Sequence, residues 1–84
     1  MEAEAVLDEL LALLEHNGVS IRTEPMGGAG GGLCKMKDKQ VFFVDAEAQT
    51  ADMAAICAGA VREMVDLENI YIRPQIRDFL EKHS

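Results

Sequence analysis

The feature that most constrains the fold is a run of glycines followed at once by two apolar segments. Five of the seven glycines fall within Met26–Gly32, and glycine loses more backbone entropy on folding than any other residue. Residues 33–37 and 40–44 then have the composition of strands, and Asp38-Lys39 between them suits a turn. The pattern predicts a glycine-rich loop that leads into a β-hairpin, on which the rest of the chain packs.

The segment before the loop predicts one helix and one further strand. Glu2–His16 repeats leucines at helical spacing, and Val19–Glu24 alternates apolar and polar residues until Pro25 ends it. The 40–44 strand is apolar on both faces, so we expect it to be central and covered on both sides. The sequence leaves open whether the first strand pairs with the second or the third.

The segment after the hairpin predicts two more helices. Thr50 is the expected N-cap of a helix that runs to about Val65, and Pro74 suits the first turn of a helix that ends near Lys82. Ile70–Ile72 is a short extended piece and a possible fourth strand. Residues 1–84 are therefore expected to form a single small α+β domain, with an antiparallel sheet of three or four strands and helices packed on it.

The charge balance argues against two classes of partner. The chain carries 8 basic and 15 acidic residues, a net charge of −7, and it lacks the basic cluster that nucleic acid or an anionic membrane attracts. Lys35, Lys37 and Lys39 alternate, which is typical of a solvent-facing or protected sheet edge. No apolar run approaches the roughly 18 residues of a membrane span, and the acidic N-terminus differs from a signal peptide. The sequence predicts a cytoplasmic protein that has free thiols and binds neither nucleic acid nor a membrane.

The glycine loop does not fit a nucleotide-binding motif. A dinucleotide fingerprint needs a third glycine where Leu33 or Lys35 stands, and the loop runs into a strand instead of a helix. A turned or mobile connection is the favoured interpretation. Contact with a ligand or partner is the alternative, and its candidate residues in the loop are Gly27, Gly28, Gly30, Gly31 and Gly32.

Three further side chains are candidates for chemistry. Cys34 and Cys57 lie on faces expected to be buried, although Cys34 follows the loop, whose amides could stabilise a thiolate. Asp45 ends the apolar strand, where it could cap the next helix or act as a catalytic carboxylate; the cap is favoured. The histidines and cysteines lack paired ligand spacing, so neither a metal nor another cofactor is expected.

From the glycine loop through the second helix, the chain resembles part of the ImmA/IrrE-type zinc peptidase domain. The similar segments are Gly30–Cys34, Val41–Asp45 and the helix from Thr50. In that family the helix carries His-Glu-x-x-His, whereas Gly59–Glu63 stands in the corresponding region here and contains no histidine. The resemblance therefore implies a local fold without zinc or proteolysis. The chain also resembles short bacterial proteins of unknown function.

These observations favour a non-enzymatic protein-interaction module that self-associates as a homo-oligomer. The alternative is a small ligand-binding or thiol-dependent enzyme domain that uses the Gly27–Gly32 loop with Cys34 or Asp45. A third interpretation is a relative of a peptidase that binds peptide by adding a strand to its sheet.

Overall fold

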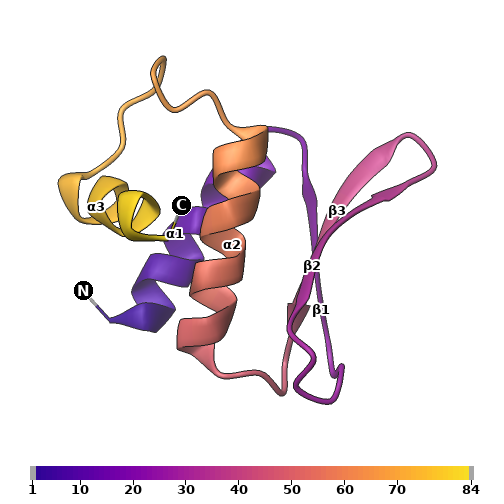
Figure 1. Ribbon diagram of the computed structural model, residues 1–84. Coiled ribbons are helices and arrows are strands. Elements are labelled where there is room, and N and C mark those ends of the chain that lie inside the picture. The colour runs from indigo at the N-terminus through magenta and orange to yellow at the C-terminus, as the bar shows by residue number, and fades with distance from the viewer. Residues whose placement is uncertain (1, 84) are drawn as a thin grey trace.

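The computed structural model describes residues 2–83, which form two layers, with helices on one side and a sheet on the other (Figure 1). The helices are α1 (Ala3–His16), α2 (Thr50–Met64) and α3 (Pro74–Lys82); the strands are β1 (Ser20–Glu24), β2 (Gly31–Met36) and β3 (Lys39–Asp45). This arrangement confirms the predicted α+β class and the predicted order of helices and strands.

The sheet is mixed, whereas the sequence predicted an antiparallel one. The strand order is β1-β3-β2; β3 pairs antiparallel with β2 and parallel with β1. The glycine loop leads from the end of β1 to the start of β2, which forms the opposite edge of the sheet. The hairpin then places β3 between these two strands. The centre suits β3 because it is the most apolar strand, and this path makes it run in the same direction as β1.

Three boundaries differ from the sequence-based expectation. β2 begins at Gly31, so two glycines assigned to the loop belong to a strand, and the hairpin turn is formed by Lys37 and Asp38. The N-cap of α2 is Gln49, not Thr50, and it makes no side-chain cap hydrogen bond. The 70–72 segment pairs with no strand in the part of the chain that the structure describes. It is held instead by Ile72, whose side chain is buried in the core.

The core lies between the helices and the inner face of the sheet. α1 and α2 pack against each other, and Phe42 and Val44 of β3 face them. The predicted apolar stripes of the helices supply the rest: Leu7, Leu10 and Leu14 from α1, Met53, Cys57, Ala60 and Val61 from α2, and Ile76 and Leu80 from α3. Every second residue of β3 therefore anchors the sheet to the helical layer.

The other face of the sheet has no covering layer among residues 2–83, so the expectation that β3 is covered on both sides is wrong. Val41 and Phe43 point to this outer face. Figure 1 shows the helices on one side of the sheet only, and the tip of the β2–β3 hairpin reaching beyond them. None of the helices in residues 2–83 has both the length and the apolar character needed to cross a membrane.

Candidate functional site

Asp45 connects the glycine loop to the central strand. Its side chain is buried, with a relative exposure of 2% for the residue. Oδ1 accepts hydrogen bonds from the backbone N–H groups of Met26 at 2.9 Å and Glu47 at 2.8 Å, and Oδ2 accepts one from Gly30 at 3.0 Å. One carboxylate thus ties both ends of the loop to the end of β3.

A second carboxylate holds the middle of the same loop. The Glu47 side chain accepts a hydrogen bond from the backbone N–H of Gly27 at 2.8 Å, at an exposed position. The carbonyl of Glu24 accepts one from the N–H of Ala46 at 3.0 Å, so the end of β1, from which the loop starts, is joined directly to the residue that follows β3. The loop is therefore fixed by hydrogen bonds and is not a mobile connection.

The backbone amides also fix the charge of Asp45. The N–H of Gly30 makes the largest contribution to lowering the pKa of this carboxyl below its ordinary value of 3.8, with help from the amides of Glu47, Met26 and Gly28. Burial acts in the opposite direction, because it disfavours the charged form. Asp45 is an anion at neutral pH.

The glycines are required for two separate reasons. All five loop and strand glycines have a positive φ, which L residues with side chains rarely adopt. At Gly31 a Cβ would also lie 2.3 Å from the carbonyl oxygen of Phe43, and at Gly30 it would lie 3.0 Å from Cδ1 of Ile56. Gly27, Gly28 and Gly32 have open space around them, so conformation alone selects glycine there.

The structure brings some predicted site residues together and separates others. Asp45 accepts hydrogen bonds from the loop at Met26 and Gly30, so it anchors the loop and does not cap α2. Cys34 is paired with Val41, four positions along β3 from Asp45, which is roughly 13 Å at the usual rise of a strand. Cys34 and Asp45 are therefore not parts of one site.

The two thiols occupy opposite environments. Cys57 has no exposed surface, as expected for a core residue, and burial raises the pKa of its thiol to about 12. Cys34 is exposed on the outer face of the sheet, so the expectation that it is buried is wrong. The alternation correctly placed Cys34 and Met36 on the same face of the strand. The helices, however, cover the opposite face, which carries Leu33.

We expect native protein at pH 8 to take up one equivalent of a thiol reagent, at Cys34. Labelling of Cys57 should be at least about 10³-fold slower, because it requires opening of the core. The measurement is intact mass against time, followed by peptide mapping. The variant Cys34→Ser is the control and should take up no label until denaturant is added. Equal labelling rates for the two thiols would contradict the buried position of Cys57.

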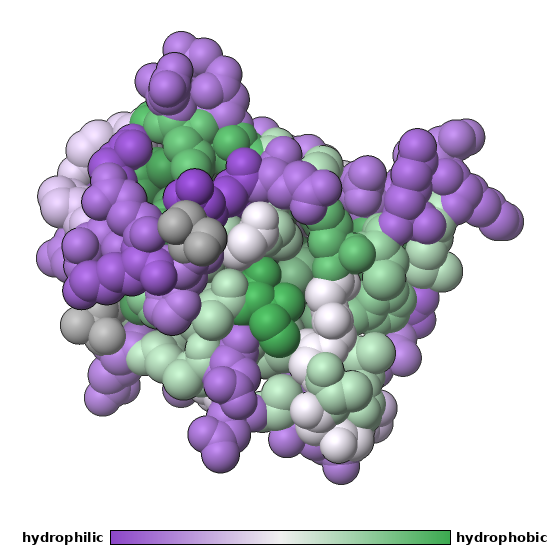
Figure 2. Space-filling model, viewed as in Figure 1, coloured by the Kyte–Doolittle hydropathy of each residue, from purple (hydrophilic) through white to green (hydrophobic). Residues whose placement is uncertain are grey.

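The outer face of the sheet carries a shallow hollow of about 450 Å³ beside the hairpin. It is lined by Arg22, Met36, Lys37, Asp38, Lys39 and Val41. The guanidinium carbon of Arg22 lies 5.9 Å from the centre of the Phe43 ring, a cation–π distance. Figure 2 shows hydrophilic side chains over the hairpin tip, next to more apolar surface. The surface combines basic groups with an apolar floor.

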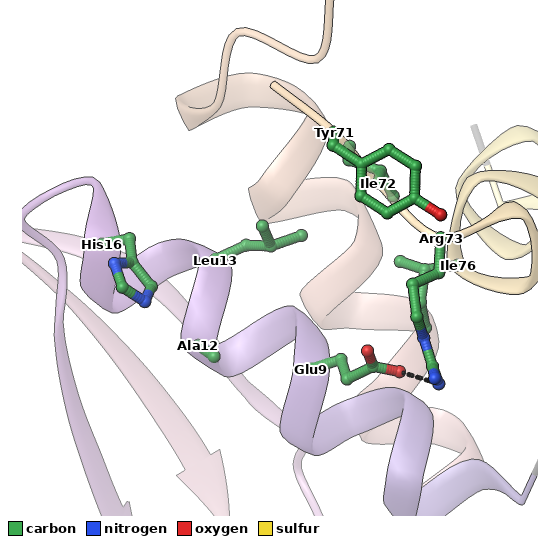
Figure 3. A pocket seen from close by; sticks show the side chains of 8 residues that line it. All are labelled: Glu9, Ala12, Leu13, His16, Tyr71, Ile72, Arg73 and Ile76. Atoms are coloured by element: carbon green, nitrogen blue, oxygen red, sulfur yellow. Dashed lines mark hydrogen bonds and ion pairs between the residues drawn. The ribbon is translucent and has the colours of Figure 1, made fainter.

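A second groove, which the sequence did not suggest, lies between α1 and the segment that leads into α3. It encloses about 230 Å³, and the Arg73–Glu9 ion pair, at 2.8 Å, closes one end (Figure 3). His16 lines the other end, and Leu13 lies between (Figure 3). Tyr71, the only tyrosine in the chain, borders it and is 82% exposed. Its residues come from distant parts of the sequence, so no local pattern indicated this groove.

Among residues 2–83, no group of three or more His, Cys, Asp or Glu side chains is arranged to hold a metal ion. Comparison with family models, with curated proteins and with solved structures finds no match to this chain. The geometry of the sheet and its loop is therefore the basis for a functional interpretation.

Proposed function

We propose that this protein is a non-enzymatic interaction module that binds a second copy of itself through its sheet. The observation that carries the proposal is that the helices cover only one face of a three-stranded sheet. Within residues 2–83, no layer covers the outer face of the sheet, and no further strand pairs with the free edges of β1 and β2. A sheet that stops after three strands leaves backbone groups at its edges, which are ready-made sites for another chain.

The state of the candidate chemical groups also supports the proposal. Both carboxylate oxygens of Asp45 already accept backbone hydrogen bonds, and Cys57 is enclosed in the core. Cys34 is accessible but lies apart from Asp45. The glycine loop is hydrogen-bonded to Asp45 and Glu47, so its amides are engaged within the molecule. Asp45, Glu47 and Cys57 are therefore engaged within the fold, which leaves the open side of the sheet as the surface for contact with a partner.

Sedimentation equilibrium from micromolar to millimolar concentration tests the proposal. The chain has a mass of 9.2 kDa, and we expect the average mass to rise toward twice that value in a reversible manner. Amide spectra at the same concentrations should show that signals from β1 or the outer face move while those of Cys57 and its core neighbours do not. A constant monomer mass over the whole range would overturn the proposal.

A further inference from the structure

The two edges of the sheet differ in how well they are protected. At one edge, β2 contains two glycines and Lys35, and the adjacent turn carries Lys37. Lysine side chains and irregular backbone are standard protection against the addition of another strand. At the other edge, β1 has no lysine, and Pro25 follows only after its last residue. β1 is therefore the less protected of the two edges.

The register of the sheet shows which backbone groups face this edge. The carbonyl of Glu24 accepts the N–H of Ala46 from the β3 side, so the peptide groups of Glu24 point into the sheet. Backbone groups alternate along a strand. The N–H and C=O groups of Ile21 and Thr23 therefore point away from β3, toward the free edge.

The side chains of β1 form a pattern that can complement itself. Arg22 and Glu24 both point to the outer face and make an ion pair at 2.9 Å, with about half of each side chain exposed. When a second β1 lies antiparallel to the first and Thr23 pairs with Thr23 of the other copy, each Arg22 lies directly opposite Glu24 of that copy. The two arginines and two glutamates then form a cluster at the interface in which each charge neighbours charges of opposite sign.

Other symmetric registers lack this complementarity. A register centred on Arg22 sets two guanidinium groups against each other, which is destabilising. A register centred on Ile21 sets Arg22 opposite Ser20 and leaves Glu24 without a cation from the other copy. Of these three registers, only the one centred on Thr23 pairs opposite charges on the same face.

We propose that two copies associate by antiparallel pairing of their β1 strands, centred on Thr23, to form one continuous sheet. This inference rests on the proposed self-association and names its surface and register. Packing of two outer faces is the competing arrangement. It is disfavoured because Val41 is only 7% exposed even without a covering element, and because Arg22 and Lys39 of both copies would meet there. Edge pairing instead leaves the outer faces side by side.

Cysteine cross-linking tests the register directly. In a hydrogen-bonded antiparallel pair the two Cα atoms are about 5.5 Å apart, within the range of about 4.4–6.8 Å that a disulfide needs. In a Cys34→Ser background, Thr23→Cys should therefore form a disulfide-linked dimer on mild oxidation. Ser20→Cys in the same background is the matched control. In this register its two copies are roughly 20 Å apart, so it should stay monomeric on a reducing-agent-free gel.

Exchange of the Arg22 and Glu24 charges tests the same interface without a disulfide cross-link. Arg22→Glu and Glu24→Arg, made singly, each set like charges opposite one another and should weaken dimerisation by at least about tenfold. The double variant Arg22→Glu/Glu24→Arg restores alternating signs and should return the dissociation constant to within about threefold of wild type. Circular dichroism of each variant confirms that its monomer is folded.

The outcomes separate this inference from the proposed function. A reversible dimer in which Thr23→Cys does not cross-link, or in which the double exchange does not restore affinity, would overturn edge pairing and leave self-association intact. A monomer at every concentration would overturn both. Cross-linking at position 23 but not at position 20, together with rescue by the double exchange, would establish the register.

Discussion

Replacement of Gly31 by alanine should destroy most of the stability of this protein. A Cβ at this position would lie 2.3 Å from the carbonyl oxygen of Phe43, and φ is +85°. Phe43 belongs to the central strand, which is paired on both sides, so its backbone cannot move away easily. The clash and the strained conformation together should cost about 3–5 kcal/mol. That is close to the whole stability of a domain this small.

Urea denaturation followed by circular dichroism measures this effect. We expect Gly31→Ala to be partly or fully unfolded without denaturant at 25 °C. Gly28→Ala is the matched control, because Gly28 also has a positive φ, of +84°, but nothing lies within 4 Å of its added Cβ. It should lose only about 1 kcal/mol, from backbone strain. Equal losses in the two variants would show that the close approach to Phe43 has no energetic consequence.

The contrast between these two glycines shows what the sequence could and could not reveal. The density of glycines indicated that backbone conformation mattered in this segment. It could not separate Gly31, which packs against a neighbouring strand, from Gly28, which has open space around it. That difference depends on which strand lies next to β2, and local pattern does not determine strand order. The same reason explains why the parallel pairing of β1 with β3 was missed.

The faces of the hairpin were ambiguous for a related reason. Cys34 and Met36 are apolar, as Leu33 is, and the face that carries Leu33 also carries Lys35. The helices cover the face of Leu33, and Lys35 stays exposed because the hairpin tip extends beyond them (Figure 1). When helices cover only part of a strand, apolar and polar residues do not alternate regularly along it. Predictions of the buried face depend on that alternation. The helices and the central strand were predictable because their apolar patterns are long and continuous.

Asp45 illustrates the same limit at the candidate site. Its position after the apolar strand suggested a helix cap or a catalytic carboxylate, and the favoured cap is not what the structure shows. Nothing local to that strand or to the glycine loop indicated that the carboxylate would accept the amides of that loop, because the contact joins Asp45 to Gly30 and Met26 across 15 and 19 residues. A buried carboxylate needs such donors. The backbone N–H groups of the glycine loop are such donors, because a loop leaves them without partners in a helix or a sheet.

Replacement of Asp45 by asparagine should lower the melting temperature by roughly 10 °C at pH 7. Asparagine keeps the size of the side chain but removes the charge, and it turns an NH2 group toward backbone N–H donors that need an acceptor. The amide signals of Met26 and Gly30 should shift most, because these groups bind the carboxylate directly. Asp38→Asn removes one negative charge from an exposed turn position and controls for the change in net charge.

The stability difference between wild type and Asp45→Asn should itself depend on pH. Because the pKa of Asp45 is lower in the folded protein than its ordinary value of 3.8, the ionised carboxylate stabilises the fold above that value. The difference should be complete above about pH 5. It should shrink as pH falls through 3.8 and vanish below the folded pKa, where Asp45 is protonated in both states. Urea denaturation from neutral pH to about pH 2 measures it. A difference that stays constant at the lowest pH would mean that the shape of the side chain, and not its charge, holds the loop.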